Sequence, residues 1–416
     1  MSRLREDAVA ITRAAIDACM PREVVLRALK QLPKVTGRTV LVAIGKAAWT
    51  MAEAALEVLG DVIDAGVVIT KYDHARGELH NVRVFEAGHP VPDEGTLIAT
   101  RAALELTKDL SREDLVLFLV SGGGSALFES VDCSLEELQQ INRALLAGGA
   151  SIDEVNVVRK HLSGVKGGRF ALHCAPAQVF SVLLSDVLGD RVDTIASGPA
   201  VPDESTVEQA LSIAARCGVP LTDATRALLM RETPKSLSNA SYVVGGSVRE
   251  LCTHAAEAAR ALGYCTHLLT DGLCCEAAEA GAFLASEARA YADTEEPIAL
   301  IAGGETVVHL RGNGLGGRNQ ELALSAAIGL AGMENAALIS VGSDGTDGPT
   351  DAAGGYVDGA TVATLKKKGM DARSMLSNND SYHALAACDG LIVTGPTGTN
   401  VNDVAVVLVL PNRKNG

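Results

Sequence analysis

A short apolar segment that runs straight into three glycines constrains this chain more than any other feature. Residues 115–120 are apolar at every position, too short for a membrane span and typical of a strand buried on both faces. The glycine turn that follows precedes an expected helix, and this arrangement points backbone N–H groups and a positive helix end at an anion. The segment therefore predicts a phosphate or carboxylate site, the alternative being a tight turn without a ligand. The residues expected to bind are Ser121, Gly122, Gly123, Gly124 and Ser125.

Composition favours an α/β protein of more than one domain. The 416 residues include 47% hydrophobic but only 3% aromatic residues, so the cores must be built from Ala, Val, Leu and Ile, as in parallel sheets covered by Ala-rich helices. The net charge of −15 argues against nucleic acid or an anionic membrane surface as a partner. An anionic small-molecule substrate then needs a locally basic site.

Neither a secreted nor a membrane protein is indicated. The nine cysteines form no C-x-x-C pair, and the N-terminal residues MSRLREDAV lack the apolar core of a signal peptide. No apolar run approaches the roughly 20 residues of a membrane helix. We therefore expect a soluble, cytoplasmic protein. The sequence leaves its oligomeric state open, with a homodimer among the alternatives.

Strands and helices alternate along the chain, which predicts a right-handed, doubly wound, Rossmann-like sheet in the first half. S-x-x-E capping boxes predict helices that begin at Ser134, Ser151 and Ser205. The polar stretch 231–241 is the expected linker, so we divide the chain into domains 1–237 and 238–416. In the second domain, 298–302 and 306–310 are expected to be strands joined as a hairpin through Gly303-Gly304.

Basic residues occur at two places where an anion could bind. Lys46 follows the strand 39–44, and the carboxyl ends of parallel strands face the ligand crevice. The segment 156–169 gathers four cations without an acid, so an anion contact is as plausible there as a solvated helix end. Its candidate anion ligands are Arg159, Lys160 and Lys166.

Two acidic loops follow strands. Asp186 and Asp190 come after the strand 179–184, and Asp344 and Asp347 follow the strand 337–341. Carboxylates at such places can hold Mg²⁺ or accept a proton from a substrate hydroxyl, although each acid alone is more often a turn former. We expect Asp186 or Asp190 to be the base or a magnesium ligand, with Asp186 as the catalytic candidate, and Asp344 and Asp347 to be further metal ligands.

The segment 303–321 contains Gly312, Gly314 and Gly317, a formal match to the G-x-G-x-x-G fingerprint of dinucleotide sites. The match is weak, because the fingerprint should follow the first strand of a βαβ unit with an acid about 20 residues on. We interpret 312–317 as a mobile loop that presents Arg318, with Asn319 beside it, to a phosphoryl group.

Taken together, these motifs resemble the glycerate 2-kinase family, whose C-terminal half is called MOFRL. The matching segments cover nearly the whole chain in the right order; they are AIGKAA, VSGGGSALF, NVVRKHLSGVKGGR, SDVLGD, SGPAVPD, GGETVV, GGRNQE, GSDGTDGPTDAAGG and GPTGTNVND. The resemblance implies two α/β domains, an N-terminal Rossmann-like domain and a C-terminal MOFRL domain, with the site in the interdomain cleft.

The resemblance also implies the reaction, in which ATP, with Mg²⁺, phosphorylates the 2-hydroxyl of D-glycerate. The lysine and arginine credited with catalysis in the family match Lys46 and Arg318. Two alternatives stay open: an NAD(P)H-dependent hydroxypyruvate reductase, and a non-catalytic sensor of a sugar acid.

Overall fold

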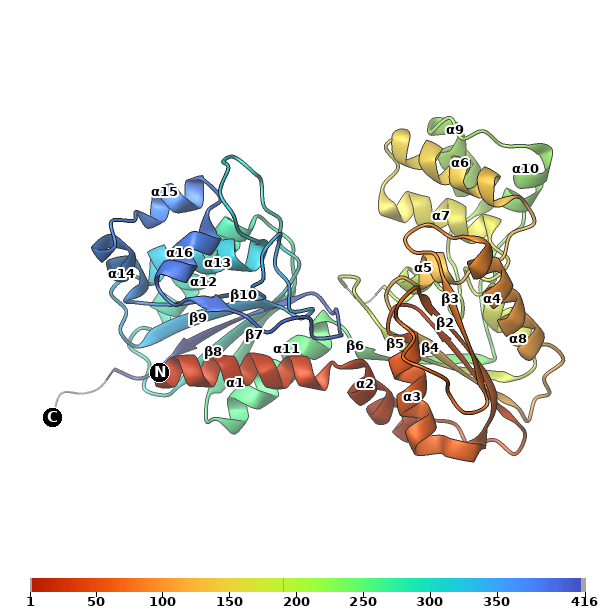
Figure 1. The fold of residues 1–416 in the computed structure, drawn as a ribbon, viewed down its shortest axis with the longest axis horizontal. Coiled ribbons are helices and arrows are strands. Elements are labelled where there is room, and N and C mark those ends of the chain that lie inside the picture. The colour runs from red at the N-terminus through yellow and green to blue at the C-terminus, as the bar shows by residue number, and fades with distance from the viewer. Residues whose placement is uncertain (1, 190, 413–416) are drawn as a thin grey trace. The chain divides into compact units, whose positions relative to one another are not determined.

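The computed structural model describes residues 2–189 and 191–412, which fold as two compact units, each around a six-stranded sheet (Figure 1). The N-terminal unit takes Pro21–Ser185 and Arg191–Gly245, and the C-terminal unit takes the described residues of Met1–Met20, Asp186–Asp190 and Gly246–Gly416. The contacts thus assign the first helix and a short loop after residue 185 to the C-terminal unit.

The sheet of the N-terminal unit has the strand order β3-β2-β1-β4-β5-β6, and its neighbours from β3 to β5 are parallel. Strands β1 and β4 are buried at every residue, as their continuous apolar runs predict. The strands are β1 (Thr39–Ile44), β2 (Ile63–Lys71), β3 (Val82–Ala87), β4 (Leu115–Val120), β5 (Gln178–Leu184) and β6 (Ala240–Gly246).

Helices of the N-terminal unit pack on both faces of this sheet, as a doubly wound fold requires (Figure 1). Helices α2 and α3 pack against each other, with α2 on β5 and α3 on β1 and β2, whereas α4 packs on β2 and β3. The helices in this part of the chain are α2 (Pro21–Ala28), α3 (Ala48–Leu59), α4 (Glu94–Leu106), α5 (Gly124–Leu127), α6 (Leu135–Ala147), α7 (Ile152–Leu162), α8 (Arg169–Cys174), α9 (Val207–Arg216) and α10 (Asp223–Leu229), with short 3₁₀ turns η1 (Leu29–Gln31), η2 (Gly60–Val62) and η3 (Ile195–Ser197).

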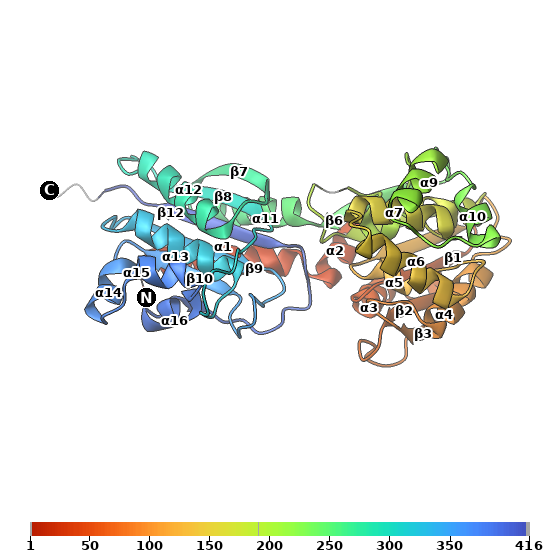
Figure 2. The ribbon, with the colours of Figure 1, turned by 90° about the horizontal axis from the view of Figure 1, so that it is seen from above.

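Four of these helices, α6, α7, α9 and α10, pack around a small apolar core of their own (Figure 2). The predicted capping boxes at Ser134 and Ser151 are confirmed and open α6 and α7. The box predicted at Ser205 is wrong by one residue, since Thr206 caps α9 with Gln209. The hydroxyl of Ser205 instead donates to the carboxylate of Asp203.

The C-terminal unit has a mixed sheet of order β11-β10-β9-β12-β8-β7, in which β12 runs antiparallel to both β8 and β9. Helices α1 and α11 pack together on one face, and α12 and α13 pack together on the other (Figure 1). The strands are β7 (Cys265–Leu273), β8 (Ile298–Gly304), β9 (Ala336–Gly342), β10 (Gly354–Asp358), β11 (Leu391–Ile392) and β12 (Asp403–Val409). The helices are α1 (Arg3–Ala18), α11 (Val248–Ala261), α12 (Ala277–Ala290), α13 (Arg318–Leu330), α14 (Thr361–Lys367), α15 (Ala372–Ser377) and α16 (Ser381–Ala387).

The two-domain α/β fold is as predicted, but one hairpin is not. Residues 306–310 form no strand beyond a single bridge from Val307 to Glu276, and Leu310 is 81% exposed. Strand β8 pairs instead with β12, about a hundred residues away in sequence. The sequence did not predict strand β10, because the pair Gly354-Gly355 at its beginning is typical of a turn. Among the described residues, no helix has both the length and the apolar character needed to cross a membrane.

Candidate functional site

The first group of candidate residues lies where the strand order of the N-terminal unit reverses, between β1 and β4. At such a switch point the loops after the two strands leave in opposite directions and open a crevice. The two loops are joined by hydrogen bonds: the Lys46 N–H donates to the Gly122 carbonyl (2.9 Å), and the Ala47 N–H to Ser121 Oγ (3.0 Å). Gly45 is needed at this junction, because it has φ +112° and a Cβ there would lie 2.3 Å from Ser121 Oγ.

The triple-glycine turn offers free backbone donors. Within residues 2–189 and 191–412, the N–H groups of Gly122, Gly123 and Ser125 find no acceptor. Gly123 has φ +87°, the left-handed conformation that turns successive amides to one side. Helix α5 is only four residues long, so the helix dipole expected from the sequence is largely missing. Backbone amides, rather than a helix end, make this turn suited to an anion.

The side chains of His89 and Lys46 lie close to Gly123 in this turn. A Cβ built on Gly123 would lie 3.0 Å from His89 Cδ2, 3.1 Å from His89 Nε2 and 3.3 Å from Lys46 Cγ. Lys46 is exposed, and no carboxylate within the described residues pairs with its ammonium group. The ring nitrogen Nδ1 of His74 lies 3.0 Å from the Lys46 carbonyl oxygen. The structure thus brings Lys46 and the residues 121–125 together.

His89 was not among the predicted site residues. Burial lowers the pKa of its imidazole, and the charges of Lys46 and Lys71 lower it further. The sequence signal that could have identified His89 is the loop GHPVPDEG. This loop follows a strand whose carboxyl end lies at the same edge of the sheet as Lys46, and it precedes a helix.

The basic segment 156–169 is largely committed to internal contacts. Lys166 is fully buried, and its ammonium donates to Glu129 Oε2 (2.5 Å) and to the Phe128 carbonyl (2.9 Å). Burial lowers the pKa of Lys166, although Glu129 opposes this shift. The Arg159 Nε donates to Asn142 Oδ1 (2.8 Å). For Lys166 these contacts indicate a structural role.

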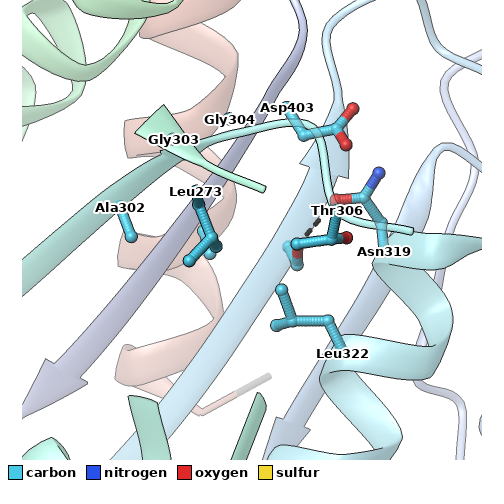
Figure 3. Close-up of a pocket in the computed structure, with 10 residues that line it drawn as sticks. Leu273, Ala302, Gly303, Gly304, Thr306, Asn319, Leu322 and Asp403 are labelled. Carbon is cyan, nitrogen blue, oxygen red and sulfur yellow. Dashed lines mark hydrogen bonds between the residues drawn. The ribbon is translucent and has the colours of Figure 1, made fainter. Parts of the chain in front are cut away.

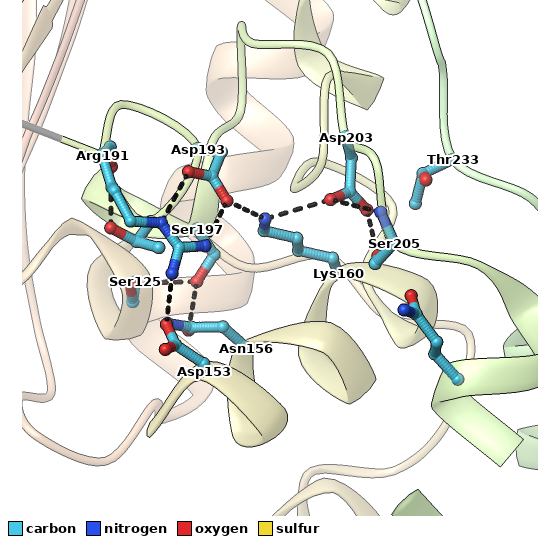
Figure 4. A network of polar contacts seen from close by, with 12 residues as sticks. Ser125, Asp153, Asn156, Lys160, Arg191, Asp193, Ser197, Asp203, Ser205 and Thr233 are labelled. Carbon is cyan, nitrogen blue, oxygen red and sulfur yellow. Dashed lines mark hydrogen bonds and ion pairs between the residues drawn. The ribbon is translucent and has the colours of Figure 1, made fainter. Parts of the chain in front are cut away.

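Lys160 is also buried, and it bridges two carboxylates. Its ammonium lies 3.0 Å from Asp193 Oδ2 and 3.0 Å from Asp203 Oδ1, as Figure 4 shows. Burial alone would raise the pKa of both acids, but for Asp193 the hydrogen bonds from Arg191 and Lys160 lower it. For Asp203, the hydrogen bond from the Ser205 hydroxyl and the contact with Lys160 lower the pKa.

This bridge lies beside the turn η3, which contacts the glycine turn. Ser197 Oγ lies 3.1 Å from Ser125 Oγ and donates to Asn156 Oδ1 (3.1 Å), so these three side chains form one chain of contacts (Figure 4). A cavity of about 620 Å³ is lined by the same region, including Asn156, Lys160 and Asp193. Lys160 therefore supports the wall of this cavity rather than presenting a free charge.

The second group of candidate residues lies in the C-terminal unit, at the end of β8 and at the beginnings of α13 and β12. Arg318 donates from Nε to Asp403 Oδ2 (2.5 Å), from Nη2 to Asp403 Oδ1 (3.0 Å) and from Nη1 to Glu305 Oε1 (2.8 Å). Burial would lower the pKa of Arg318, but Asp403 and Glu305 raise it above its ordinary value. The raised pKa keeps the guanidinium charged, and 34% of the side-chain surface stays exposed.

Asp347, predicted to bind a metal, caps helix α13 instead. Its carboxylate accepts the backbone N–H of Asn319 (3.1 Å) and of Gln320 (2.9 Å), two donors that a helix start leaves without partners. Burial raises its pKa to about 6, even though these amides act in the opposite direction. The side chain of Asn319, predicted to bind substrate, is buried against Ser340, whose hydroxyl donates to Asn319 Oδ1 (2.6 Å).

A cavity of about 10 Å³ lies behind Asn319 and Asp403, between β8, β12 and α13 (Figure 3). Such a space holds about one water molecule. In front of Arg318 lies a much larger groove of about 600 Å³, lined by Arg318 and Glu305 and by apolar residues that include Leu310 and Pro349. Its volume is within the range of small-molecule sites.

The other predicted acids are placed as follows. Asp344 accepts the Thr346 N–H through Oδ1 (2.9 Å), and Asp190 lies outside the described residues. Across residues 2–189 and 191–412, no three His, Cys, Asp or Glu side chains gather in a way that could hold a metal ion. Asp186 has an exposed side chain. Its carbonyl accepts a hydrogen bond from Asn402 Nδ2 (3.2 Å), which also donates to Glu305 Oε2 (3.2 Å).

Asn402 is a residue that the sequence did not single out. It is 4% exposed with φ +65°, and its amide connects the Asp186 segment to the Arg318 cluster through Glu305. The motif GPTGTNVND contains it, but nothing local to the sequence distinguishes Asn402 from Asn400.

The loop 311–317 makes hydrogen bonds to the segment before α16. The mobility expected for residues 312–317 stays a prediction. The backbone N–H groups of Arg311 and Gly312 donate to Asn379 Oδ1 (2.7 and 3.1 Å), and the Gly314 N–H donates to the Asn378 carbonyl (2.9 Å). No strand runs directly into this loop, so its glycines do not form the strand–turn–helix of a dinucleotide site.

Two family models match the chain. One, described as a domain of unknown function (DUF4147), matches residues 7–230, and the other, described as the MOFRL family, matches residues 298–403. Together they span both units.

Relatives match over nearly their whole length. A Thermotoga maritima protein named D-glycerate 2-kinase is 52% identical over 98% of this chain and 99% of its own. A Pyrococcus horikoshii protein named glycerate 2-kinase is 39% identical over 99% and 98%. An Agrobacterium vitis protein named provisionally as a hydroxypyruvate reductase is 40% identical over 95% and 92%. A crystal structure of glycerate kinase from Thermotoga maritima superposes with a TM-score of 0.93, at 52% identity, over 98% of this chain and 99% of that one.

Proposed function

Because the chain belongs to the glycerate 2-kinase family, we propose that it transfers the γ-phosphoryl group of ATP to the 2-hydroxyl of D-glycerate. The products are 2-phosphoglycerate and ADP. The observation that supports this most directly is the position of Lys46 beside the free amides of Gly122, Gly123 and Ser125, at the switch point of a doubly wound sheet. Donors and a cation at this place suit a phosphate or a substrate carboxylate.

Phosphoryl transfer asks the protein mainly for positioning and for positive charge around the moving group. In the proposal, the amides of the glycine turn bind an anionic group and Lys46 neutralises charge on the γ-phosphate. Arg318 contributes a second cation, held in a fixed orientation by Asp403 and Glu305. Arginine binds phosphate through two parallel N–H donors, which suits this role.

Lys160 and Lys166 are not part of this proposal, because each ammonium already contacts a buried carboxylate. Asp347 is left out as a metal ligand, because its two oxygens accept amides of α13. Mg²⁺ in kinases is usually bound by substrate phosphates and one or two carboxylates. Among the acids predicted to be ligands, Asp344 is the one within the described residues that fits this pattern. The ion would neutralise phosphate charge.

The reductase alternative is weaker. A dinucleotide fingerprint should follow the first strand of the Rossmann-like sheet, but β1 is followed by Gly45, Lys46 and two alanines. The glycines at 312–317 belong to a packed loop outside any strand–helix turn. What favours the reductase is the name given to the Agrobacterium vitis relative.

The test is an assay of ADP release with D-glycerate, with the product identified as 2- or 3-phosphoglycerate. We expect ADP in equal amount to 2-phosphoglycerate. Lys46→Ala and Arg318→Ala should each lower kcat by roughly 10²–10³, as for other preorganised electrostatic contacts. Oxidation of NADH by hydroxypyruvate without ATP would point to the reductase. Ligand-dependent stabilisation with no ADP formed would point to a sensor.

We also propose a cytoplasmic location. All nine cysteines are free, and Cys265, Cys274 and Cys275 are exposed, an arrangement suited to a reducing compartment. Fractionation of the producing cell tests this proposal, and recovery of the protein outside the cytoplasm would contradict it.

A further inference from the structure

His89 stands on a loop whose shape is fixed by hydrogen bonds. The loop connects β3 to α4, and Asp93 at its end caps α4 by accepting the Thr96 N–H (2.9 Å). The same carboxylate accepts the hydroxyl of Tyr72 (2.8 Å), which lies just after β2. This anchoring at the end of the loop holds the backbone near His89, so its imidazole is presented from a defined position.

The imidazole is aimed at the anion-binding turn. Its Nε2 lies 3.1 Å from the place that a Cβ on Gly123 would occupy, and Lys46 Cγ lies 3.3 Å from the same point. His89 is half-buried, and its ring nitrogens make no hydrogen bond to protein groups within residues 2–189 and 191–412. Its nitrogens are therefore available to a ligand bound at the turn.

The charges around His89 favour its neutral form. Burial is the largest cause of the lowered pKa of His89. The charges of Lys46 after β1, and of Lys71 and His74 around the end of β2, lower this pKa further. The facing acids are occupied elsewhere: Glu86 accepts the N–H groups of His74 and Ala75, and Asp93 caps α4. A neutral imidazole can accept a proton at pH 7, whereas an imidazolium cannot.

Other bases near the turn are poorly suited to this task. Asp193 and Asp203 are bound by Lys160, and their lowered pKa values make them weak proton acceptors. Within the N-terminal unit, His89 is thus the unengaged base that lies next to Lys46.

We propose that His89 is a further catalytic residue, which accepts the proton of the substrate hydroxyl at the triple-glycine turn. This inference rests on the proposed kinase function. The hydroxyl oxygen forms a bond to the γ-phosphorus, and the bond from that phosphorus to the β,γ-bridging oxygen breaks. The proton passes from the hydroxyl to a ring nitrogen of His89, and the electron pair of the broken bond leaves with ADP. The imidazolium then loses its proton to water.

The experiment compares His89→Gln with the full-length wild-type protein in the ADP assay. Glutamine keeps a hydrogen-bonding amide but cannot accept the proton. General bases contribute about 10²–10⁴-fold, so we expect kcat to fall by that factor while KM for D-glycerate changes little. The matched control is His80→Gln, since His80 is an exposed histidine of the preceding loop, and it should keep wild-type kcat.

The pH profile provides a readout that a structural role would not change. Wild-type kcat should fall at acid pH as an imidazole with a pKa below its usual range becomes protonated, and His89→Gln should lose this acid limb. Added imidazole should restore part of the activity of His89→Ala. A normal kcat in His89→Gln, a raised KM at unchanged kcat, or an acid limb that persists in the variant would each overturn the proposal.

The failure of the wider function is distinguishable from the failure of this residue's role. If the wild-type protein releases no ADP with D-glycerate, the kinase function itself is wrong. If the wild-type protein is active and the variants keep their activity, only the role of His89 is wrong. The wild-type acid limb is measured without any variant, so misfolding of a substituted protein would not leave the proposal untested.

Discussion

At the residue scale, the chemistry of a side chain in this protein depends on which group it meets. Asp347 and Asp344 lie three positions apart in one glycine-rich loop, and both looked like metal ligands in the sequence. In the structure, the carboxylate of Asp347 accepts hydrogen bonds from backbone N–H groups of α13. The carboxylate of Asp344 accepts a hydrogen bond from the backbone N–H two residues further along the chain. Lys46 and Lys166 differ in the same way, since one is exposed and the other is paired with Glu129.

The burial of Asp347 predicts a pH dependence of stability. Its pKa is raised to about 6 in the folded state, against about 3.9 in the unfolded chain. The folded protein therefore holds the extra proton between these values, and the contribution of Asp347 to stability falls as pH rises from about 4 to 6. The free energy of unfolding of the wild-type protein, relative to Asp347→Asn, should drop by about 3 kcal/mol across that window. Urea unfolding at several pH values measures it, and parallel curves for the two proteins would contradict the assignment.

At the scale of elements, the turns between helices and strands decide how the site is built. Helix α5 has four residues, so its contribution is a turn of free amides rather than a dipole. The loop before α13 donates backbone hydrogen bonds to Asn378 and Asn379. The segment between α7 and α8 is attached to the second residue after α5 by the buried pair of Lys166 and Glu129. The basic segment 156–169 resembles an anion site in the sequence, but these internal contacts give it a structural role.

The pair of Lys166 and Glu129 predicts a loss of stability that can be separated from a loss of ligand binding. Lys166→Met leaves Glu129 buried without its cation, and breaking a buried pair in this way costs about 3–5 kcal/mol. The double variant Lys166→Met with Glu129→Gln removes the stranded charge and should recover much of that loss. Thermal and denaturant unfolding measure both variants. A Lys166→Met protein of normal stability with weaker nucleotide binding would instead restore the predicted anion role.

At the scale of the whole molecule, chain order and spatial grouping differ. Helix α1 begins the chain but packs on α11, β9 and β12 of the C-terminal unit, and the hydroxyl of Tyr264 donates to Asp7 (2.6 Å). The two proposed catalytic cations are likewise divided, with Lys46 in the N-terminal unit and Arg318 in the C-terminal unit. The proposed function requires both to act on one reaction.

A double-mutant cycle tests this requirement. If Lys46 and Arg318 stabilise charge on the same phosphoryl group, the effects of Lys46→Ala and Arg318→Ala on kcat should not multiply in the double variant. Single losses of roughly 10²–10³ should give a double loss clearly smaller than their product. The ADP assay measures all four proteins. Losses that multiply fully would indicate that the two residues act independently.

The sequence by itself determined what depends on local pattern. The apolar runs of β1 and β4, the capping boxes of α6 and α7, and the glycine turn directly after β4 follow from neighbours within a few residues. Only the tertiary structure decided the pairing of β8 with β12, the capping of α13 by Asp347 and the position of His89 over Gly123. Each of these joins groups far apart in the chain, and such contacts depend on burial and on the competition for hydrogen-bond partners in the folded core. No local spacing records that competition.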